Sequence, residues 1–189
     1  MEDSTKPLIL EADLLVIGWG KAGKTLARDL ASSGRRVVLV ERDDTMIGGT
    51  CINVACVPTK TLVNLAERRG DREPDEYLKQ AIASRDALID RLRAANKAML
   101  SSLETVTLVH GEARFTGPRR VRVQAGEETL DITAGAVVIN TGTSPLMPGI
   151  PGIDGKFVHD STTIQHIADG KVPQTLTIVG GGFIGLEFA

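Results

Sequence analysis

Residues 13–41 read DLLVIGWGKAGKTLARDLASSGRRVVLVE, and this stretch decides the fold. Its beginning, residues 13–17, is rich in apolar strand formers and predicts a buried parallel strand. Apolar residues then recur at helical spacing over 26–31, until a Ser-Gly pair ends the helix. Residues 37–40 predict a second strand. Together these elements form a strand–helix–strand unit, which is typical of an α/β fold with a parallel sheet.

The turn between the first strand and the helix is rich in glycine. Gly18, Gly20 and Gly23 have the spacing G-x-G-x-x-G, and Glu41 follows the second strand, 18 positions beyond Gly23. Such glycines permit a tight turn and the close approach of a pyrophosphate, whose charge is favoured by the helix N-terminus. Glu41 can accept hydrogen bonds from ribose hydroxyls and would repel a 2′-phosphate. The pattern predicts a dinucleotide site, and Trp19 is expected to pack beside the turn.

The composition is that of an ordinary globular protein. Of the 189 residues, 42% are hydrophobic and 24% are charged, and the net charge is −2. These values argue against disorder, a fibrous repeat and a basic surface for nucleic acid. No apolar stretch approaches the roughly 18 residues of a spanning helix, and the acidic N-terminus does not have the layout of a signal peptide. We expect a soluble cytoplasmic protein with neither nucleic acid nor membrane as a partner.

The only two cysteines lie close together in residues 48–60, GGTCINVACVPTK. Cys51 and Cys56 have the spacing C-x4-C, which differs from the C-x2-C of most zinc sites and from the thioredoxin-type pair. A disulfide over so short a loop stabilises a fold by only roughly 2 kcal/mol, which a domain of this size hardly needs. A thiol near a helix N-terminus is biased toward the reactive thiolate. The pattern therefore favours a redox-active disulfide over a metal site or inert buried thiols.

The spacing of the cysteines also has a geometric consequence. On a regular helix, positions five apart lie about 140° around the axis, because one turn takes 3.6 residues. A disulfide between them would therefore need a distorted first turn. Pro58 disfavours helical geometry at Val57, and Gly48 and Gly49 loosen the preceding turn. We expect a regular helix from Thr59 onward.

The middle of the chain predicts one long helix and several short strands. The helix, over 74–103, has an apolar face of the kind that packs in a core. His110, His159 and His166 have no ligand spacing and are predicted to be surface or capping residues. Strands are expected at 105–109, 113–115, 121–124, 130–133 and 136–140, and the middle three of these form a meander.

The pattern of the first strand and turn recurs near the end of the sequence. Residues 176–179 predict a strand that leads into Gly180, Gly182 and Gly185, again spaced G-x-G-x-x-G. A second strand and its acidic residue do not follow before Ala189, so the sequence leaves NAD and NADP undistinguished. We therefore expect an incomplete chain.

The run GGTCxNxxCxPTK, about 25 residues after the first glycine turn, resembles the class I pyridine nucleotide–disulfide oxidoreductases. These include glutathione reductase, dihydrolipoamide dehydrogenase and mercuric reductase. The wording GKAGKTLA at 20–27 and GGTCIN at 48–53 is most similar to a mercuric-reductase-like branch that includes the reactive-chlorine-resistance flavoproteins. Ala55 stands where that branch commonly has glycine, so a small packing change is expected there.

The resemblance implies a fold class and a division into domains. The fold is α/β, with a Rossmann-like FAD-binding domain of three layers (ββα), a small antiparallel β-meander and the truncated start of a second nucleotide-binding domain. We expect an N-terminal tail at 1–11 and the FAD-binding domain with its redox disulfide at 12–150. A linker at 151–172 and an incomplete NAD(P)-binding domain at 173–189 follow.

The resemblance also implies the cofactors FAD and NAD(P)H. The first glycine turn would face the FAD pyrophosphate, and Glu41 would face the adenosine ribose. The residues expected at FAD are Gly18, Gly20, Lys21, Ala22, Gly23, Glu41, Arg42, Gly48, Gly49, Thr50, Cys51, Lys60, Ala113, Thr141 and Gly142, and those expected at NAD(P) are Gly180, Gly182 and Gly185.

Four residues receive catalytic roles from the resemblance. Cys51 would be the interchange thiol, and Cys56 would form a charge-transfer thiolate against the flavin. Lys60 would lie near flavin N5, and Glu187 would pair with Lys60. Electrons would pass from NAD(P)H to FAD, then to the Cys51–Cys56 disulfide and on to an acceptor.

The acceptor and the partners are expectations of the same kind. A small-molecule disulfide or a metal ion such as Cu(II) or Hg(II) would take the electrons, and no resident metal is implied. The full-length protein would be a homodimer. An alternative is an FAD-binding module without turnover of its own, with a structural or regulatory role. A dehydrogenase that binds only NAD would leave the cysteine motif unexplained.

Overall fold

The computed structural model describes residues 7–167 and 171–189, so the first part of the predicted tail and residues 168–170 of the predicted linker lie outside the described residues. The chain divides into two compact units, one with the residues up to Asn53 together with Leu92–Gly142, the other with Val54–Arg91 together with Thr143–Ala189. The elements are β1 (Leu8–Ile17), α1 (Lys21–Ser32), β2 (Val37–Glu41), η1 (Asp44–Met46), α2 (Thr50–Asn53), α3 (Cys56–Glu67), α4 (Pro74–Ser101), β3 (Val106–His110), β4 (Glu112–Gly117), β5 (Arg120–Ala125), β6 (Glu128–Ile139), η2 (Ile164–His166) and α5 (Phe183–Phe188).

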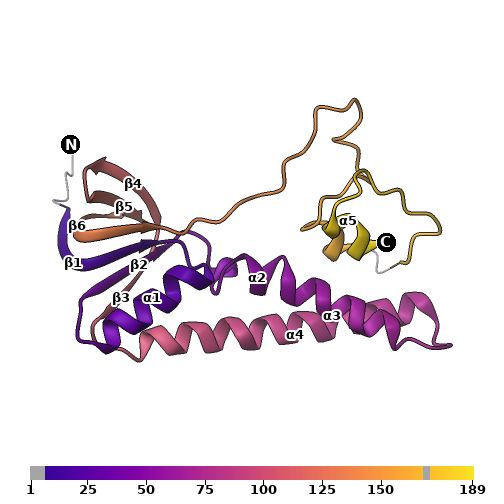
Figure 1. Cartoon of the computed structure of the whole chain (residues 1–189), viewed down its shortest axis with the longest axis horizontal. Helices are drawn as coiled ribbons and strands as arrows, with labels where there is room; N and C mark the ends of the chain where they lie inside the picture. Colours follow the sequence, from indigo (N-terminus) through magenta and orange to yellow (C-terminus); the bar gives the residue numbers. More distant parts are fainter. Residues whose placement is uncertain (1–6, 168–170) are drawn as a thin grey trace. The chain divides into compact units, whose positions relative to one another are not determined.

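A six-stranded sheet forms the first unit's centre, in the order β3-β2-β1-β6-β5-β4 (Figure 1). Strands β3, β2, β1 and β6 run parallel, whereas β6, β5 and β4 run antiparallel. The predicted α/β class and the predicted meander are therefore confirmed. Because β1, β2, β3 and β6 are parallel, their carboxyl ends meet at one edge of the sheet.

Both faces of strand β1 are buried over residues 14–16, as the apolar run there predicts. On one face, Leu14 and Val16 belong to a core cluster with Ala27 and Ala31 of α1. On the opposite face, Leu15 belongs to a second cluster with residues of β2, β5 and β6. Successive side chains of a strand point to opposite faces, so β1 joins both clusters. This packing fixes α1 against the sheet and its first turn near the carboxyl edge.

Two predicted strand boundaries were wrong. Strand β1 begins at Leu8, and residues 8–11, expected in the tail, pair with residues 130–133 of β6. Residues 130–133 and 136–140, predicted as separate strands, belong to the single strand β6 up to Ile139. The parallel register continues from Leu8 opposite Leu130 to Ile17 opposite Ile139. Pairing with β1 therefore keeps β6 extended, although the local sequence of β6 predicts a break between residues 133 and 136.

The second unit consists of helices and irregular segments. The Tyr77 hydroxyl of α4 donates to the carbonyl of Leu65 in α3 at 2.9 Å, and the Arg72 guanidinium lies 4.1 Å from the centre of the Tyr77 ring. The strand predicted at 176–179 does not form. A strand needs a hydrogen-bonded neighbour, and no described segment pairs with these residues. The helix expected after the second glycine turn does form, as α5.

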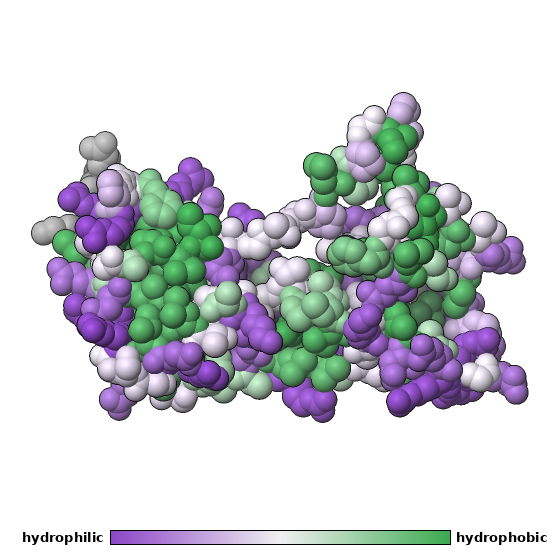
Figure 2. Space-filling model, in the orientation of Figure 1, coloured by the Kyte–Doolittle hydropathy of each residue, from purple (hydrophilic) through white to green (hydrophobic). Residues whose placement is uncertain are grey.

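Large apolar side chains are exposed along residues 143–189. Leu146 is 94% exposed, Phe157 is 84% exposed and Phe183 is 83% exposed. Figure 2 shows apolar residues on the surface of this part of the chain. Within residues 7–167 and 171–189, no helix combines the length and the apolar character that crossing a membrane requires.

Candidate functional site

The carboxyl edge of the parallel strands brings together residues that are far apart in the sequence. Gly18 follows β1, Glu41 ends β2, and Asn140 follows β6. The register confirms this proximity, because Ile17 lies opposite both Val40 and Ile139. In open α/β sheets, ligands bind beyond this edge, where the connections leave the sheet in opposite directions. The predicted glycine turn therefore lies where a dinucleotide site is expected.

The glycine turn is packed so closely that a side chain at its third glycine would collide with its neighbours. A Cβ on Gly23 would lie 2.5 Å from Nδ2 of Asn140 and 2.6 Å from Cγ1 of Val16. The same Asn140 amide donates to the carbonyls of Gly18 at 3.1 Å and Gly20 at 2.9 Å. Asn140 therefore fixes the turn, although no site role was predicted for it. The one sequence feature that could have indicated this role is its place as a polar residue at the end of an apolar strand.

The Glu41 carboxylate closes the turn from the side of β2. Its Oε2 accepts from the backbone N–H of Trp19 at 3.0 Å, and its Oε1 accepts from those of Arg42 at 2.9 Å and Asp43 at 3.2 Å. A carboxylate has about four acceptor positions, so one position remains for a hydroxyl group. The Trp19 side chain is buried in the core cluster of α1, which confirms its predicted packing beside the turn.

The cysteine motif begins against the glycine turn. Gly49 has a φ of +83°, and a Cβ on it would lie 2.6 Å from the Cα of Gly20 and 3.1 Å from the carbonyl oxygen of Trp19. Only a residue without a side chain fits such a contact at positive φ. The backbone that leads into Thr50 and Cys51 is therefore held directly on the predicted dinucleotide turn.

Asn53 fixes the loop before Cys51. Its Nδ2 donates to the carbonyls of Ile47 at 3.0 Å and Gly49 at 2.9 Å, and its Oδ1 accepts from Arg93 on α4 at 3.0 Å and 3.2 Å. The Asn53 side chain is buried. The cysteine motif includes this asparagine, but the clamp was not predicted, because its partner on α4 is 40 positions away in the sequence.

Replacing this clamp gives a stability prediction. Asn53→Ala removes the buried hydrogen bonds to two carbonyls and to Arg93, and should lower the free energy of unfolding by roughly 3 kcal/mol. Urea denaturation followed by circular dichroism measures the change. Asn64→Ala, at an exposed position of α3, is the matched control and should have an effect of less than about 0.5 kcal/mol. Equal effects of the two substitutions would contradict the clamp.

The helix is interrupted between the two cysteines. Helix α2 ends at Asn53 and α3 begins at Cys56, and Ala55 between them has φ −131° and ψ −103°. The expected distortion is therefore present. The prediction that Val57 is non-helical and that the regular helix begins at Thr59 was wrong. Pro58 is the third residue of α3, where its missing N–H has no intrahelical partner to lose.

The two thiols differ in exposure. Cys51 is half-buried in α2, whereas Cys56 is exposed at the first position of α3. In the part of the chain that the structure describes, no disulfide bond joins them. The redox disulfide between them stays a prediction.

The second unit contains the predicted pair of Lys60 and Glu187. Lys60 on α3 forms an ion pair with Glu187 on α5, which confirms the predicted contact. The Lys60 side chain is 73% exposed and that of Glu187 is 24% exposed. An ion pair of this exposure adds little to stability. The ion pair instead links the Lys60 side chain of α3 to α5.

Gln165 organises the beginning of α3, and no sequence motif marks it. Its buried Nε2 lies within hydrogen-bond distance of the Val54 carbonyl at 3.1 Å, the Thr59 hydroxyl at 3.2 Å and the Ser161 carbonyl at 2.9 Å. The fully buried guanidinium of Arg85 donates to the backbone carbonyl of Gln165. The segment just before Cys56 is thus held by residues more than 100 positions away in sequence.

Comparison with known proteins identifies the family. Residues 12–189 match the sequence profile of the pyridine nucleotide-disulphide oxidoreductases. The chain belongs to this family. It is 40% identical over 176 residues to the probable pyridine nucleotide-disulfide oxidoreductase RclA of Escherichia coli K12, which covers 93% of this chain and 38% of RclA. It is 35% identical to the mercuric reductase of Streptomyces lividans, over 94% of this chain and 39% of that protein.

A solved structure agrees with this assignment. The Cu(II) complex of the HOCl-induced flavoprotein disulfide reductase RclA from Escherichia coli superposes with a TM-score of 0.85 at 39% sequence identity, covering 94% of this chain and 39% of that chain. The chain thus spans somewhat less than two fifths of the length of these relatives. The resemblance that the cysteine motif indicated is confirmed.

The other predicted cofactor residues lie mostly at the surface. Thr141 and Gly142 follow β6, and a Cβ on Gly142 would lie 3.1 Å from the Thr50 hydroxyl, so this segment borders the cysteine motif. Ala113 lies on β4 opposite Val123 and is half-buried. Exposed or half-buried positions are also occupied by Lys21, Ala22, Arg42, Gly180, Gly182 and Gly185. Their contacts with cofactors stay predictions.

The three histidines are exposed, as predicted for surface residues. One of them, His110 at the end of β3, lies 3.1 Å through its Nδ1 from Oδ1 of Asp44.

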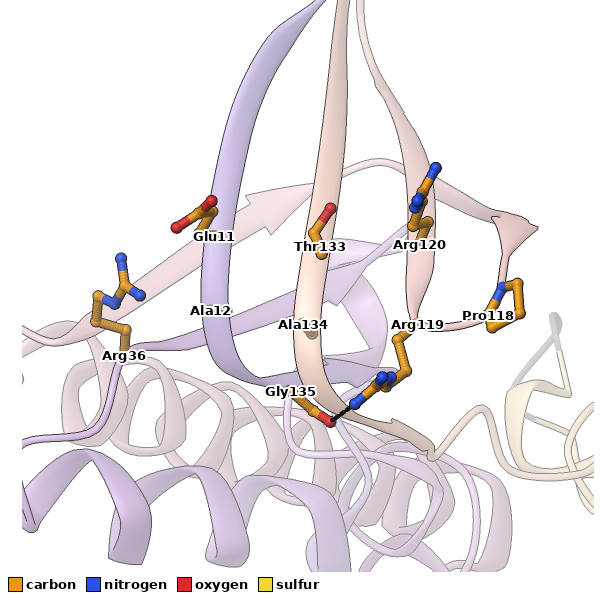
Figure 3. A pocket seen from close by; sticks show the side chains of 9 residues that line it. All are labelled: Glu11, Ala12, Arg36, Pro118, Arg119, Arg120, Thr133, Ala134 and Gly135. Carbon is orange, nitrogen blue, oxygen red and sulfur yellow. Dashed lines mark hydrogen bonds between the residues drawn. The ribbon is translucent and has the colours of Figure 1, made fainter.

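A separate pocket of about 400 Å³ lies toward the amino-terminal half of β1 (Figure 3). Its lining includes Glu11, Arg36, Arg119 and Arg120. Figure 3 shows that Arg119 turns toward the Gly135 carbonyl, to which it donates at 3.4 Å. None of the residues predicted to bind a cofactor lines this pocket, so it is distinct from the family's expected site.

Proposed function

We propose that this chain is the FAD-binding, redox-disulfide portion of an NAD(P)H-dependent flavoprotein oxidoreductase. The single observation that carries the proposal is the contact between two motifs. Gly49, which opens the cysteine motif, is packed on Gly20 of the dinucleotide turn. A cofactor held by that turn lies next to the backbone that bears Cys51. A purely structural role of the two thiols would not require this contact with the dinucleotide turn.

The residues present fit FAD. At Gly23 the turn offers only backbone to a ligand, and Asn140 lies where a side chain on this residue would be. The backbone N–H groups at the start of α1 favour a pyrophosphate. Glu41 keeps one acceptor position for a ribose hydroxyl. These residues would hold the adenosine and pyrophosphate parts of the cofactor.

The chemistry then depends on the two cysteines. Bound FAD would supply two-electron chemistry, with NAD(P)H as the hydride donor and the protein disulfide as the electron acceptor. Reduction of the Cys51–Cys56 disulfide takes up two electrons and two protons and gives two thiols. The Cys51 thiolate then attacks an acceptor disulfide, and Cys56 displaces the mixed disulfide, so that the acceptor leaves as two thiols. Lys60, which forms an ion pair with Glu187, would contribute a positive charge that favours the reduced flavin, as the family resemblance implies.

The names of the relatives suggest the class of acceptor. One relative is a mercuric reductase, and one solved relative is a Cu(II) complex. We propose a small disulfide or a thiophilic metal ion as the acceptor here, because both react with an adjacent pair of thiols.

A visible absorption spectrum tests the proposal. The purified protein, supplied with FAD, should show flavin bands, and anaerobic reduction with a dithiol should add a long-wavelength charge-transfer band. Cys56→Ser should remove that band and keep the flavin bands. A protein that stays colourless with FAD yet binds NAD tightly would contradict the proposal and indicate a dehydrogenase. Flavin bands without any thiol-dependent change would instead favour a flavin-binding module without turnover.

A further inference from the structure

Lys24 is a buried lysine that none of the predicted roles uses. It follows Gly23 in α1 and is 8% exposed. Its Nζ donates to the carbonyl oxygen of Gly48 at 3.3 Å and also to Oδ1 of Asn96 on α4. Both acceptors are neutral, so they satisfy hydrogen bonds without balancing the charge. Because a buried cation is unfavourable unless it is paired, the environment of Lys24 calls for an anion.

The charged groups around Lys24 point to that anion. The pKa of the Lys24 ammonium lies below its ordinary value, because burial lowers it most; the charge of Cys51 acts in the opposite direction, and repulsion from Lys21 lowers the pKa further. Lys21 lies one turn earlier on α1 and is exposed. From α4, the group that faces Lys24 is the neutral amide of Asn96. Among these neighbours Cys51 alone can carry a negative charge, as its thiolate.

The segment from Gly48 to Cys51 is held by side-chain contacts. Gly48, which accepts from Lys24, precedes Cys51 by three positions. Asn53 donates to the carbonyl of Gly49, and Arg93 on α4 donates to Asn53. The segment that leads into Cys51 is thus held both by Lys24 on α1 and, through Asn53, by Arg93 on α4. Coulomb attraction is mutual, so an ammonium that the thiolate stabilises must stabilise the thiolate equally.

We propose that Lys24 is a positioning residue whose buried charge holds Cys51 in its thiolate form. The inference rests on the proposed function, in which Cys51 exchanges with the acceptor. The Cys51 thiolate attacks one sulfur of the acceptor disulfide, a new S–S bond forms, and the acceptor's own S–S bond breaks. The departing thiolate takes its proton from water, so Lys24 keeps its charge throughout.

The test is the pH profile of Cys51 alkylation. With Cys56→Ser, Cys51 is the only thiol of the chain, and iodoacetamide reacts with its thiolate. Lys24→Gln keeps a hydrogen-bond donor and removes the charge. We expect it to slow alkylation at pH 7 about tenfold and to move the midpoint of the profile to higher pH. Lys24→Arg restores the charge and should restore the rate to within about threefold. Mass spectrometry quantifies the modified peptide.

Lys21→Gln is the matched control, because Lys21 lies on the same helix but is exposed. Its effect should be less than about twofold, since solvent and salt screen an exposed charge. Identical profiles for the parent and Lys24→Gln overturn the inference, and so do equal effects of the two lysines. If Lys24→Gln does not fold, the parent alone decides: its alkylation midpoint must lie below that of free cysteine, and a midpoint at or above that value overturns the inference.

The readout needs neither flavin nor nicotinamide, which separates this inference from the proposed function. A shifted Cys51 profile in a protein without flavin chemistry overturns the proposed function alone. An unshifted profile in a protein with full flavin chemistry overturns the role of Lys24 alone. Loss of flavin in Lys24→Gln with unchanged alkylation assigns Lys24 to cofactor binding and likewise overturns the inference.

Discussion

Gly23→Val should produce a chain that no longer retains FAD and that unfolds at a temperature roughly 10 °C lower. The added Cβ alone would lie 2.5 Å from Nδ2 of Asn140 and 2.6 Å from Val16. Overpacking of this kind, with loss of the hydrogen bonds from Asn140 to the turn, should lower the free energy of unfolding by about 3 kcal/mol. Thermal denaturation by circular dichroism and the ratio of flavin to protein absorbance measure the two effects.

A second glycine controls for the substitution itself. Gly117 ends β4, has no positive φ, and has nothing within 4 Å of the place where a Cβ would lie. Gly117→Val should leave the unfolding temperature within about 2 °C of the parent and the flavin content unchanged. Gly23→Val with unaltered flavin content would show that the turn adapts, and the cofactor would then have to be held by other residues.

The parts of the fold that were predicted correctly are those that local patterns determine. Residues 13–17 and 37–40 are apolar runs of strand formers, and the helix after Gly23 repeats its apolar residues at helical spacing. The errors occurred where a distant neighbour decides. Residues 8–11 are extended because they pair with residues 130–133. Residues 176–179 have an apolar strand sequence, but no described segment offers them a partner. Strand propensity therefore predicts candidates, and pairing selects among them.

The candidate site shows the same division. Its glycines and cysteines were found because their spacing within one short segment carries the chemistry. Asn140 was missed as a site residue because its partners Gly18 and Gly20 lie about 120 positions earlier, and Lys24 was missed because Asn96 is 72 positions away. The predicted Lys60–Glu187 contact is also distant in sequence, and it was predicted only through the family resemblance. Motifs identify the reacting groups, whereas the residues that hold them emerge from the tertiary structure.

Cys51→Ser and Cys56→Ser should each slow the transfer of electrons from the reduced, flavin-loaded protein to a small disulfide by at least about a thousandfold. A serine hydroxyl cannot form the mixed disulfide, so either substitution interrupts covalent exchange. Because Cys51 is only half-buried and Cys56 is exposed, each substitution should change the free energy of unfolding by less than about 1 kcal/mol. Stopped-flow absorbance of the released thiol measures the rate.

The two substitutions should fail at different steps, and that difference tests the assignment of roles. Cys56→Ser leaves the Cys51 thiolate able to attack, so one equivalent of mixed disulfide should accumulate and persist. Cys51→Ser should give no rapid adduct, because the remaining thiol is expected to face the cofactor and not the acceptor. The reverse pattern would exchange the roles of the two cysteines. Rates above a tenth of the parent in both variants would mean that electrons reach the acceptor without the thiols, and the cysteine motif would then have a structural role.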